Sequence, residues 1–185
     1  MADEDLQDAR VRRIVTGHDT TGRAIFIEDA EQVGVDLAED SGRTQATFFH
    51  LWATHEMPVS LHDDALPSQR SGSATTILGT GSGSVLRIGV LGSGARSPMH
   101  RTESLDYAIC LEGECDLELD NGEVRTVRPG DVIIQRGTNH VWHNRSSAPC
   151  RFAWILLDAL PYELDGEALG TSWRHINDHE NPVGD

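Results

Sequence analysis

Two short segments of the chain carry histidine, hydroxyl and carboxylate side chains at alternate positions. Side chains two residues apart in a β-strand point the same way. If the first segment is one regular strand, four polar side chains share one face: His100, Thr102, Ser104 and Asp106. The second segment repeats the pattern with three more residues: His140, Trp142 and Asn144. Antiparallel pairing of two such strands would bring His140 opposite His100.

Two imidazoles and one carboxylate form a typical ligand set for a divalent metal ion. Borderline ions bind nitrogen and oxygen donors, and three protein ligands leave coordination positions open to water or substrate. We therefore expect one divalent ion, iron, manganese, zinc or nickel, between His100, Asp106 and His140. The sequence leaves two other roles open for Asp106, as a general base and as an acceptor that fixes the tautomer of His100.

Further residues near these ligands are candidates for binding or converting a substrate. Arg87 is a charge in an otherwise apolar segment, so an inward side chain would need a partner such as Asp106 or a substrate carboxylate. An outward Arg87 on a half-solvated sheet fits the sequence equally well. The catalytic candidates are Asp106, Arg87 and Tyr107. The candidates for the substrate pocket are Thr102, Gln135 and Trp142.

Short apolar segments separated by Gly, Asn, Asp and Pro indicate strands rather than helices. In the clearest of them Cys115, Leu117 and Leu119 alternate with carboxylates, which predicts one dry face, and the following Asn121 and Gly122 suit a tight hairpin turn. We expect strands at residues 12–15, 24–27, 46–54, 85–91, 100–111, 115–119, 124–127, 132–135 and 151–157. We also expect a loop at residues 61–83 and a short helical turn near residues 163–169.

The two polar segments resemble the two motifs of the cupin superfamily, and the resemblance covers roughly residues 85–158. The first motif is matched by Gly94, His100, Asp106 and Gly113. The second motif is matched by Gly130, Asp131, Gly137, His140 and Asn144. The resemblance implies an all-β fold, a single cupin (jelly-roll) β-barrel with an N-terminal strand extension. It also implies that the metal ligands of the family correspond to His100, Asp106 and His140.

The sequence departs from the cupin motifs at three positions. Thr102 stands where the family has its second histidine, Asp106 replaces the usual glutamate, and Gln135 takes the place of a proline. Losing one imidazole and shortening the carboxylate predicts weaker metal binding than in a four-ligand cupin. Glu103 or His143 would be a substitute ligand, although strict alternation turns both away from the interior.

Composition restricts the partners of the chain. Fifteen basic against thirty acidic residues give a net charge of -15, which repels phosphate backbones and anionic lipid surfaces. We therefore expect no nucleic-acid partner and no membrane partner. Without an apolar N-terminal run or membrane span, and with three cysteines that form no CxxC pair, the chain is expected to be cytoplasmic, with its cysteines buried as small hydrophobes.

The chain divides into three expected regions: residues 1–84, with strands and a flexible loop that complete the barrel or a dimer interface, residues 85–160, the cupin barrel, and residues 161–185, a tail. We expect a homodimer that covers the open sheet edges of the N-terminal strands. The segments at 97–107 and 135–140 resemble a cupin subgroup associated with small-molecule and polyketide-type metabolism.

This resemblance favours a metal-dependent enzyme acting on an oxygenated organic acid or ketone. Lewis-acid catalysis of a decarboxylation, a dehydration or an isomerisation would pass through an enolate, and the sequence does not choose among the three. Two alternatives stay open. One is oxygen activation by non-haem iron in a dioxygenase-type oxidoreductase. The other is a non-catalytic cupin that only binds a small molecule. Whether the chain is an enzyme is thus not settled by its sequence.

Overall fold

The computed structural model describes residues 6, 9–38, 44–61 and 83–174, and these residues form mainly β-strands and loops. The N-terminal strands are β1 (Val11–His18), β2 (Ala24–Gln32), β3 (Val35–Ala38) and β4 (Thr44–Thr54). The central strands are β5 (Ser84–Leu91), β6 (Met99–Arg101), β7 (Ser104–Glu112), β8 (Cys115–Leu119), β9 (Val124–Val127), β10 (Val132–Arg136), β11 (His140–His143) and β12 (Cys150–Asp158). The C-terminal strands are β13 (Tyr162–Leu164), β14 (Glu167–Leu169) and β15 (Ser172–Arg174).

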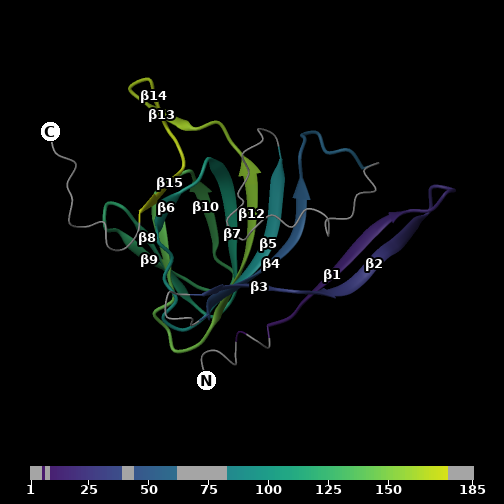
Figure 1. Cartoon of the computed structure of the whole chain (residues 1–185), viewed down its shortest axis with the longest axis horizontal. Helices are drawn as coiled ribbons and strands as arrows, with labels where there is room; N and C mark the ends of the chain where they lie inside the picture. The colour runs from purple at the N-terminus through teal and green to yellow at the C-terminus, as the bar shows by residue number, and fades with distance from the viewer. Residues whose placement is uncertain (1–5, 7–8, 39–43, 62–82, 175–185) are drawn as a thin grey trace.

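Two antiparallel sheets pack against each other to form the body of the molecule (Figure 1). One sheet has the order β10-β7-β12-β5-β4-β3 and the other the order β15-β6-β11-β8-β9. From β5 to β12 the chain crosses repeatedly between the sheets, which is the connectivity of a jelly roll. The expected all-β jelly roll is confirmed. The expected closure into a barrel is wrong for the described strands, because their hydrogen bonds form two separate sheets rather than one continuous cylinder.

The strand expected at residues 100–111 is broken in two. Strand β6 ends at Arg101 in the five-stranded sheet, and β7 begins at Ser104 in the six-stranded sheet. Thr102 and Glu103 form the corner between them. Residues on either side of this corner therefore belong to opposite sheets. The alternation of side chains along one regular strand, which was assumed from the sequence, does not predict this arrangement.

An aromatic cluster fills the space between the sheets. Trp142 of β11 contacts Phe152 of β12, with ring centroids 5.0 Å apart, and Phe152 stacks on Trp154 at 5.2 Å. The three cysteines lie in the same core, buried and without disulfide bonds, as expected: Cys110, Cys115 and Cys150. Burying such large rings removes apolar surface from water and holds the two layers together.

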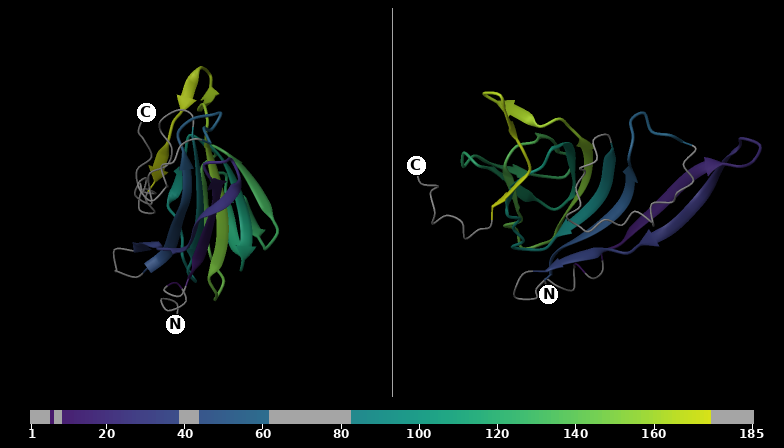
Figure 2. Two further views of the ribbon diagram at one scale, coloured as in Figure 1. Left: turned by 90° about the vertical axis from the view of Figure 1, so that its right-hand side faces the viewer. Right: turned by 45° about the horizontal axis from the view of Figure 1, so that its top comes forward.

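Two hairpins extend from this body. Strands β1 and β2, which contain the strands expected at residues 12–15 and 24–27, pair in a separate two-stranded ribbon that projects away from the sheets (Figures 1 and 2). Strands β13 and β14 form the second hairpin where a helical turn was expected, so that expectation is wrong. Its two loop residues, Asp165 and Gly166, both have positive φ angles of 53° and 84°, which is the conformation of a tight hairpin turn and incompatible with a helix.

Most other predicted strands agree with the structure within a few residues. The loop expected at 61–83 lies almost wholly outside the described residues. Strands β3 and β4 of the N-terminal region extend the six-stranded sheet beyond β5. In the part of the chain that is described, no helix is both long and apolar enough to cross a membrane.

Candidate active site between the two sheets

A small cavity of about 80 Å³, here called the inner chamber, lies between the sheets. The six-stranded sheet contributes one wall, formed by Phe48, Arg87, Leu91, Asp106, Trp154 and Leu156. The five-stranded sheet contributes the opposite wall, formed by His100, His140 and Trp142. Ser97 and Thr102 complete the lining from outside the strands. Nitrogen-bearing rings and ionisable side chains therefore face each other across a narrow, largely apolar space.

The two histidines form one wall as a directly paired set. His140 of β11 lies opposite His100 of β6 in the antiparallel register, as the sequence predicted, and their ring centroids are 4.1 Å apart. Each ring donates its Nδ1 proton to the backbone carbonyl two residues earlier, His100 to Pro98 and His140 to Thr138, both at 2.9 Å. These hydrogen bonds leave Nε2 of each imidazole as the acceptor nitrogen.

Burial keeps both imidazoles uncharged. The pKa of His140 is lowered to about 3, first by its removal from water and then by His100 and Arg87 nearby. The pKa of His100 is also lowered, mainly by burial. Charging either ring inside the protein costs free energy because the surroundings solvate the cation poorly and already contain a guanidinium. Both rings are therefore neutral at pH 7.

The facing wall carries a buried guanidinium and a buried carboxylate. Arg87 points into the inner chamber, which decides between its two predicted orientations, and its guanidinium carbon lies 5.0 Å from the centre of the Phe48 ring and 5.9 Å from that of Trp154. An aromatic face attracts a cation, so both rings favour this placement. Asp106 opposes the lowering of the Arg87 pKa that burial causes.

Asp106 is held by a chain of hydroxyl groups. Ser104 Oγ donates a hydrogen bond of 2.6 Å to Asp106 Oδ1, and the hydroxyls of Ser104 and Thr102 are 2.8 Å apart. Burial raises the pKa of the Asp106 carboxyl, while the hydrogen bond from Ser104 and the charge of Arg87 lower it in part. A carboxyl group with a raised pKa and a cation beside it is suited to accepting and releasing a proton.

The described residues do not fit the expected three-ligand metal site. Asp106 belongs to the sheet opposite the imidazoles, and no group of three or more His, Cys, Asp or Glu among these residues is placed to hold a metal ion. The amide nitrogen of Gln135 also lies 2.8 Å from His140 Nε2, where it donates a hydrogen bond to the atom that would bind the ion. Two imidazoles are thus brought together as metal binding requires, and Asp106 lines the same chamber from the facing sheet.

Six of the residues singled out from the sequence line the inner chamber: Arg87, His100, Thr102, Asp106, His140 and Trp142. Gln135 does not line it, and its amide nitrogen lies 2.8 Å from Nε2 of His140. Tyr107 is not among the lining residues, because its place next to Asp106 on β7 turns its side chain to the other face of the sheet.

The two substitute ligands considered from the sequence, Glu103 and His143, lie outside the inner chamber. Glu103 accepts a hydrogen bond from the backbone N–H of Thr171, and His143 does not line the inner chamber. Phe48 and Trp154, the aromatic partners of Arg87, were not predicted from the sequence. Both side chains lie on the inward faces of the strands that flank β5. Alternation along each strand indicates such a face, but only the strand order shows that these two strands are neighbours of β5.

Comparison with known proteins identifies the family to which the chain belongs. The model of the cupin domain matches residues 87–156. Phomopsin biosynthesis cluster protein C' of Diaporthe leptostromiformis is 41% identical over 179 residues, which cover 93% of this chain and 91% of that protein. The cupin-domain-containing oxidoreductase virC of Hypocrea virens is 38% identical, covering 84% of this chain and 80% of that protein.

Among solved structures, the polyketide cyclase RemF from Streptomyces resistomycificus is similar at 21% identity, with a TM-score of 0.46 over 72% of this chain and 74% of that one. This likeness is too low to carry an inference about function. The extended identity to cupin-domain proteins, together with the domain match and the jelly roll, shows that the chain belongs to the cupin family.

Proposed function

We propose that this cupin protein is an enzyme of small-molecule biosynthesis that converts an oxygenated organic acid or ketone through an enolate. The observation that carries the proposal is the inner chamber, in which a buried guanidinium and a carboxyl of raised pKa face two neutral imidazoles. The relatives give support from their names, since two belong to the phomopsin biosynthesis cluster and one to the oryzines biosynthesis cluster.

Arg87 and Asp106 supply the central step of the proposed reaction. Arg87 donates hydrogen bonds to the carbonyl oxygen of the substrate, and these bonds strengthen as negative charge develops on that oxygen. The Asp106 carboxylate takes the proton from the neighbouring carbon. The C–H bond breaks, its electron pair forms the enolate, and the proton stays on Asp106 Oδ, where burial favours the neutral acid. Dehydration and isomerisation pass through such an enolate, and a decarboxylation would form the enolate by breaking the C–C bond to the leaving CO₂ in place of the C–H bond.

The imidazole wall serves to bind and orient the substrate. His100 presents Nε2 as an acceptor for a substrate hydroxyl or an enol, whereas Nε2 of His140 accepts from Gln135 and would receive a substrate only if that amide turned away. The aromatic side chains around the chamber exclude water, which strengthens the interaction between Arg87 and a developing enolate.

Metal dependence is a separate part of the proposal. An ion bound by His100 and His140, iron, manganese, zinc or nickel, would polarise a carbonyl as a Lewis acid, and binding would require Gln135 to turn away from His140. Elemental analysis of protein purified without a metal-chelating tag tests this, with His100→Ala and His140→Ala beside the wild type. Metal that is lost in both variants supports the site. Metal that is absent, or that survives both changes, contradicts it.

Proton exchange tests the enolate step without knowledge of the product. Protein is incubated in D₂O with a panel of 2-oxo acids, 3-oxo acids and cyclic ketones, and the loss of the α-proton signal is followed by NMR. We expect faster exchange for at least one member, and loss of that catalysis in Arg87→Met and in Asp106→Asn. Arg125→Met, a change at an exposed arginine of β9, is the matched control. Equal exchange in all four proteins would refute the roles of Arg87 and Asp106.

An iron-dependent oxygenase is the second candidate. The names of several relatives, such as the cupin-domain-containing oxidoreductases virC and fogC, favour it. It needs a carboxylate beside the two imidazoles, and Asp106 faces them across the inner chamber. A non-catalytic binding protein is distinguished from both enzymes by turnover, since it would bind a member of a metabolite extract without depleting it.

A further inference from the structure

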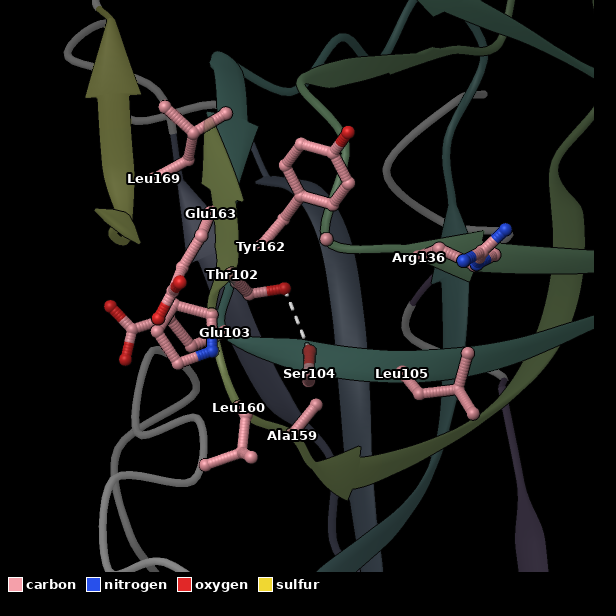
Figure 3. Close-up of a pocket in the computed structure, with 12 residues that line it drawn as sticks. Thr102, Glu103, Ser104, Leu105, Arg136, Ala159, Leu160, Tyr162, Glu163 and Leu169 are labelled. Atoms are coloured by element: carbon pink, nitrogen blue, oxygen red, sulfur yellow. Dashed lines mark hydrogen bonds between the residues drawn. The ribbon is translucent and has the colours of Figure 1, made fainter. Parts of the chain in front are cut away.

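An open groove runs over the corner between β6 and β7 (Figure 3). Its volume is about 510 Å³, and it is called the outer groove here. One side is formed by the start of β7 and the end of β10, and the other by the segment that leads from β12 into the β13–β14 hairpin. The uncharged side chains of its lining include Thr102, Ser104, Leu105, Leu160, Tyr162 and Leu169, and the charged ones are Glu103, Arg136 and Glu163.

The inner chamber is too small to hold a whole substrate of ordinary size. Its volume is about 80 Å³, whereas one water molecule requires roughly 10–15 Å³ of such space and pockets for drug-sized ligands measure roughly 300–1,000 Å³. A carbonyl or carboxylate group with its nearest carbons fits the chamber. The rest of a larger molecule must lie outside it, and the outer groove has the size that such a molecule needs.

Thr102 lies between the two spaces. It lines both the inner chamber and the outer groove, and only 4% of its surface is exposed. Ser104 lines the groove and donates its hydrogen bond to Asp106, which lines the chamber. Only two short contacts therefore separate the groove from the reactive carboxyl. The hydroxyl oxygens of Thr102 and Ser104 are 2.8 Å apart, and Ser104 Oγ is 2.6 Å from Asp106 Oδ1.

Apart from Glu163, the far side of the groove is apolar, and it is exposed. Leu160 is 94% exposed and Tyr162 is 60% exposed, and Figure 3 shows both side chains projecting from the C-terminal segment beside Thr102 and Ser104. The segment is fastened at its base, because Arg101 Nε donates to the carbonyl of Gly170 and Glu103 accepts the N–H of Thr171. An anchored segment that holds large apolar side chains in water suits an apolar ligand better than a charged one.

From the shared wall, the two volumes and the mostly apolar far side of the groove, we propose that the outer groove binds the hydrocarbon body of the substrate whose oxygenated head enters the inner chamber. This inference rests on the proposed function, since it uses the same head group at Arg87. It assigns the substrate class as an acid or ketone with an apolar chain or ring of several carbons. Leu160 and Tyr162 determine specificity for that chain and take no part in the chemistry.

A series of straight-chain carboxylates from acetate to octanoate tests the inference by calorimetric titration. The carboxylate serves as the head for Arg87, and the alkyl chain grows from the inner chamber into the outer groove. We expect weak binding of acetate and, once the chain leaves the chamber, an affinity that rises about fourfold for each added methylene. The double variant with Leu160→Ser and Tyr162→Ser should bind octanoate at least tenfold more weakly and acetate as the wild type does. Both side chains are exposed, so the variant is expected to fold.

Two further variants separate failure of the groove from failure of the head site. Leu164→Ser changes an exposed leucine of the same hairpin that does not line the groove and should leave octanoate binding unchanged. Arg87→Met should weaken acetate and octanoate by a similar factor. If the groove variant binds octanoate normally while Arg87→Met weakens it, the groove inference is wrong and the head site stands. If Arg87→Met has no effect, the head site is wrong. If no carboxylate binds the wild type, both are overturned.

Discussion

Acidification should destabilise the metal-free protein through His140, and replacing that residue should remove the effect. His140 is 2% exposed, and burial first, then His100 and Arg87, lower its pKa to about 3 from the ordinary 6.5. In the unfolded chain the ring takes up a proton below pH 6.5, whereas in the folded protein it stays neutral. A depressed folded pKa therefore contributes stability that is present above pH 6.5 and is lost as the pH falls toward 3.

The size of the effect follows from the difference in proton uptake. Each pH unit below the unfolded pKa lowers the free energy of unfolding by about 1.4 kcal/mol for one such histidine. Going from pH 7.5 to pH 5.5 crosses one unit below 6.5, so His140 should account for a loss of about 1.4 kcal/mol. His140→Gln cannot take up this proton. Its difference in stability from the wild type should change by that amount between the two pH values.

Urea unfolding followed by tryptophan fluorescence measures the difference, with a chelator present so that the metal-free chain is compared. A pH of 5.5 stays above the sequence pI of about 4.8, which limits precipitation. His18→Gln, a change at an exposed histidine of β1, is the control. If the stability difference between wild type and His140→Gln is the same at pH 7.5 and 5.5, the imidazole is not held neutral and its assignment as a buried acceptor fails.

Three further predictions concern the core, the hairpin and the carboxyl. Phe152→Ala removes a ring with 0% exposure between two tryptophans and should lower the free energy of unfolding by about 3–5 kcal/mol in urea titrations; a loss below 1 kcal/mol would contradict the packing. Phe26→Ser on the β1–β2 hairpin, at a side chain 75% exposed, should shift the expected homodimer toward monomer in sedimentation equilibrium, and an unchanged mass would remove this hairpin from the interface. Ser104→Ala removes the hydrogen bond that lowers the Asp106 pKa, so the rising limb of the pH–rate profile should move to higher pH, and an unmoved limb would speak against Asp106 as the base.

Alternation along the chain predicted the fold where a segment stays within one sheet. The pairing of β8 with β9, the inward ring of Trp142 and the placement of His140 opposite His100 all follow from a two-residue period and an antiparallel register. Each of these features depends only on residues close together in the sequence or on the pairing of two strands. A single sequence contains that information because a half-buried strand must direct its apolar and polar side chains to opposite faces.

Features that depend on several strands were not predictable in the same way. The corner at Thr102 and Glu103 contains neither Gly nor Pro, so nothing local marks the change of sheet. The orientation of Arg87 depends on Phe48 and Trp154, which lie on the two strands that flank β5. The hairpin after β12 is different, because its Asp-Gly turn is a recognised local signal that the sequence analysis passed over.

The corner at Thr102 explains why the site has two chemically different walls. Because the chain leaves one sheet after His100 and enters the other before Asp106, the imidazole and the carboxyl are carried by opposite layers rather than by one face. Thr102 occupies the position of the second histidine in the cupin motif, and here its hydroxyl contacts Ser104, which in turn donates to Asp106. Polar groups at the corner therefore lead from the outer groove to the carboxyl instead of adding a third nitrogen beside His100 and His140. An arrangement of this kind favours proton transfer at the charged wall, with the imidazoles as fixed acceptors opposite it.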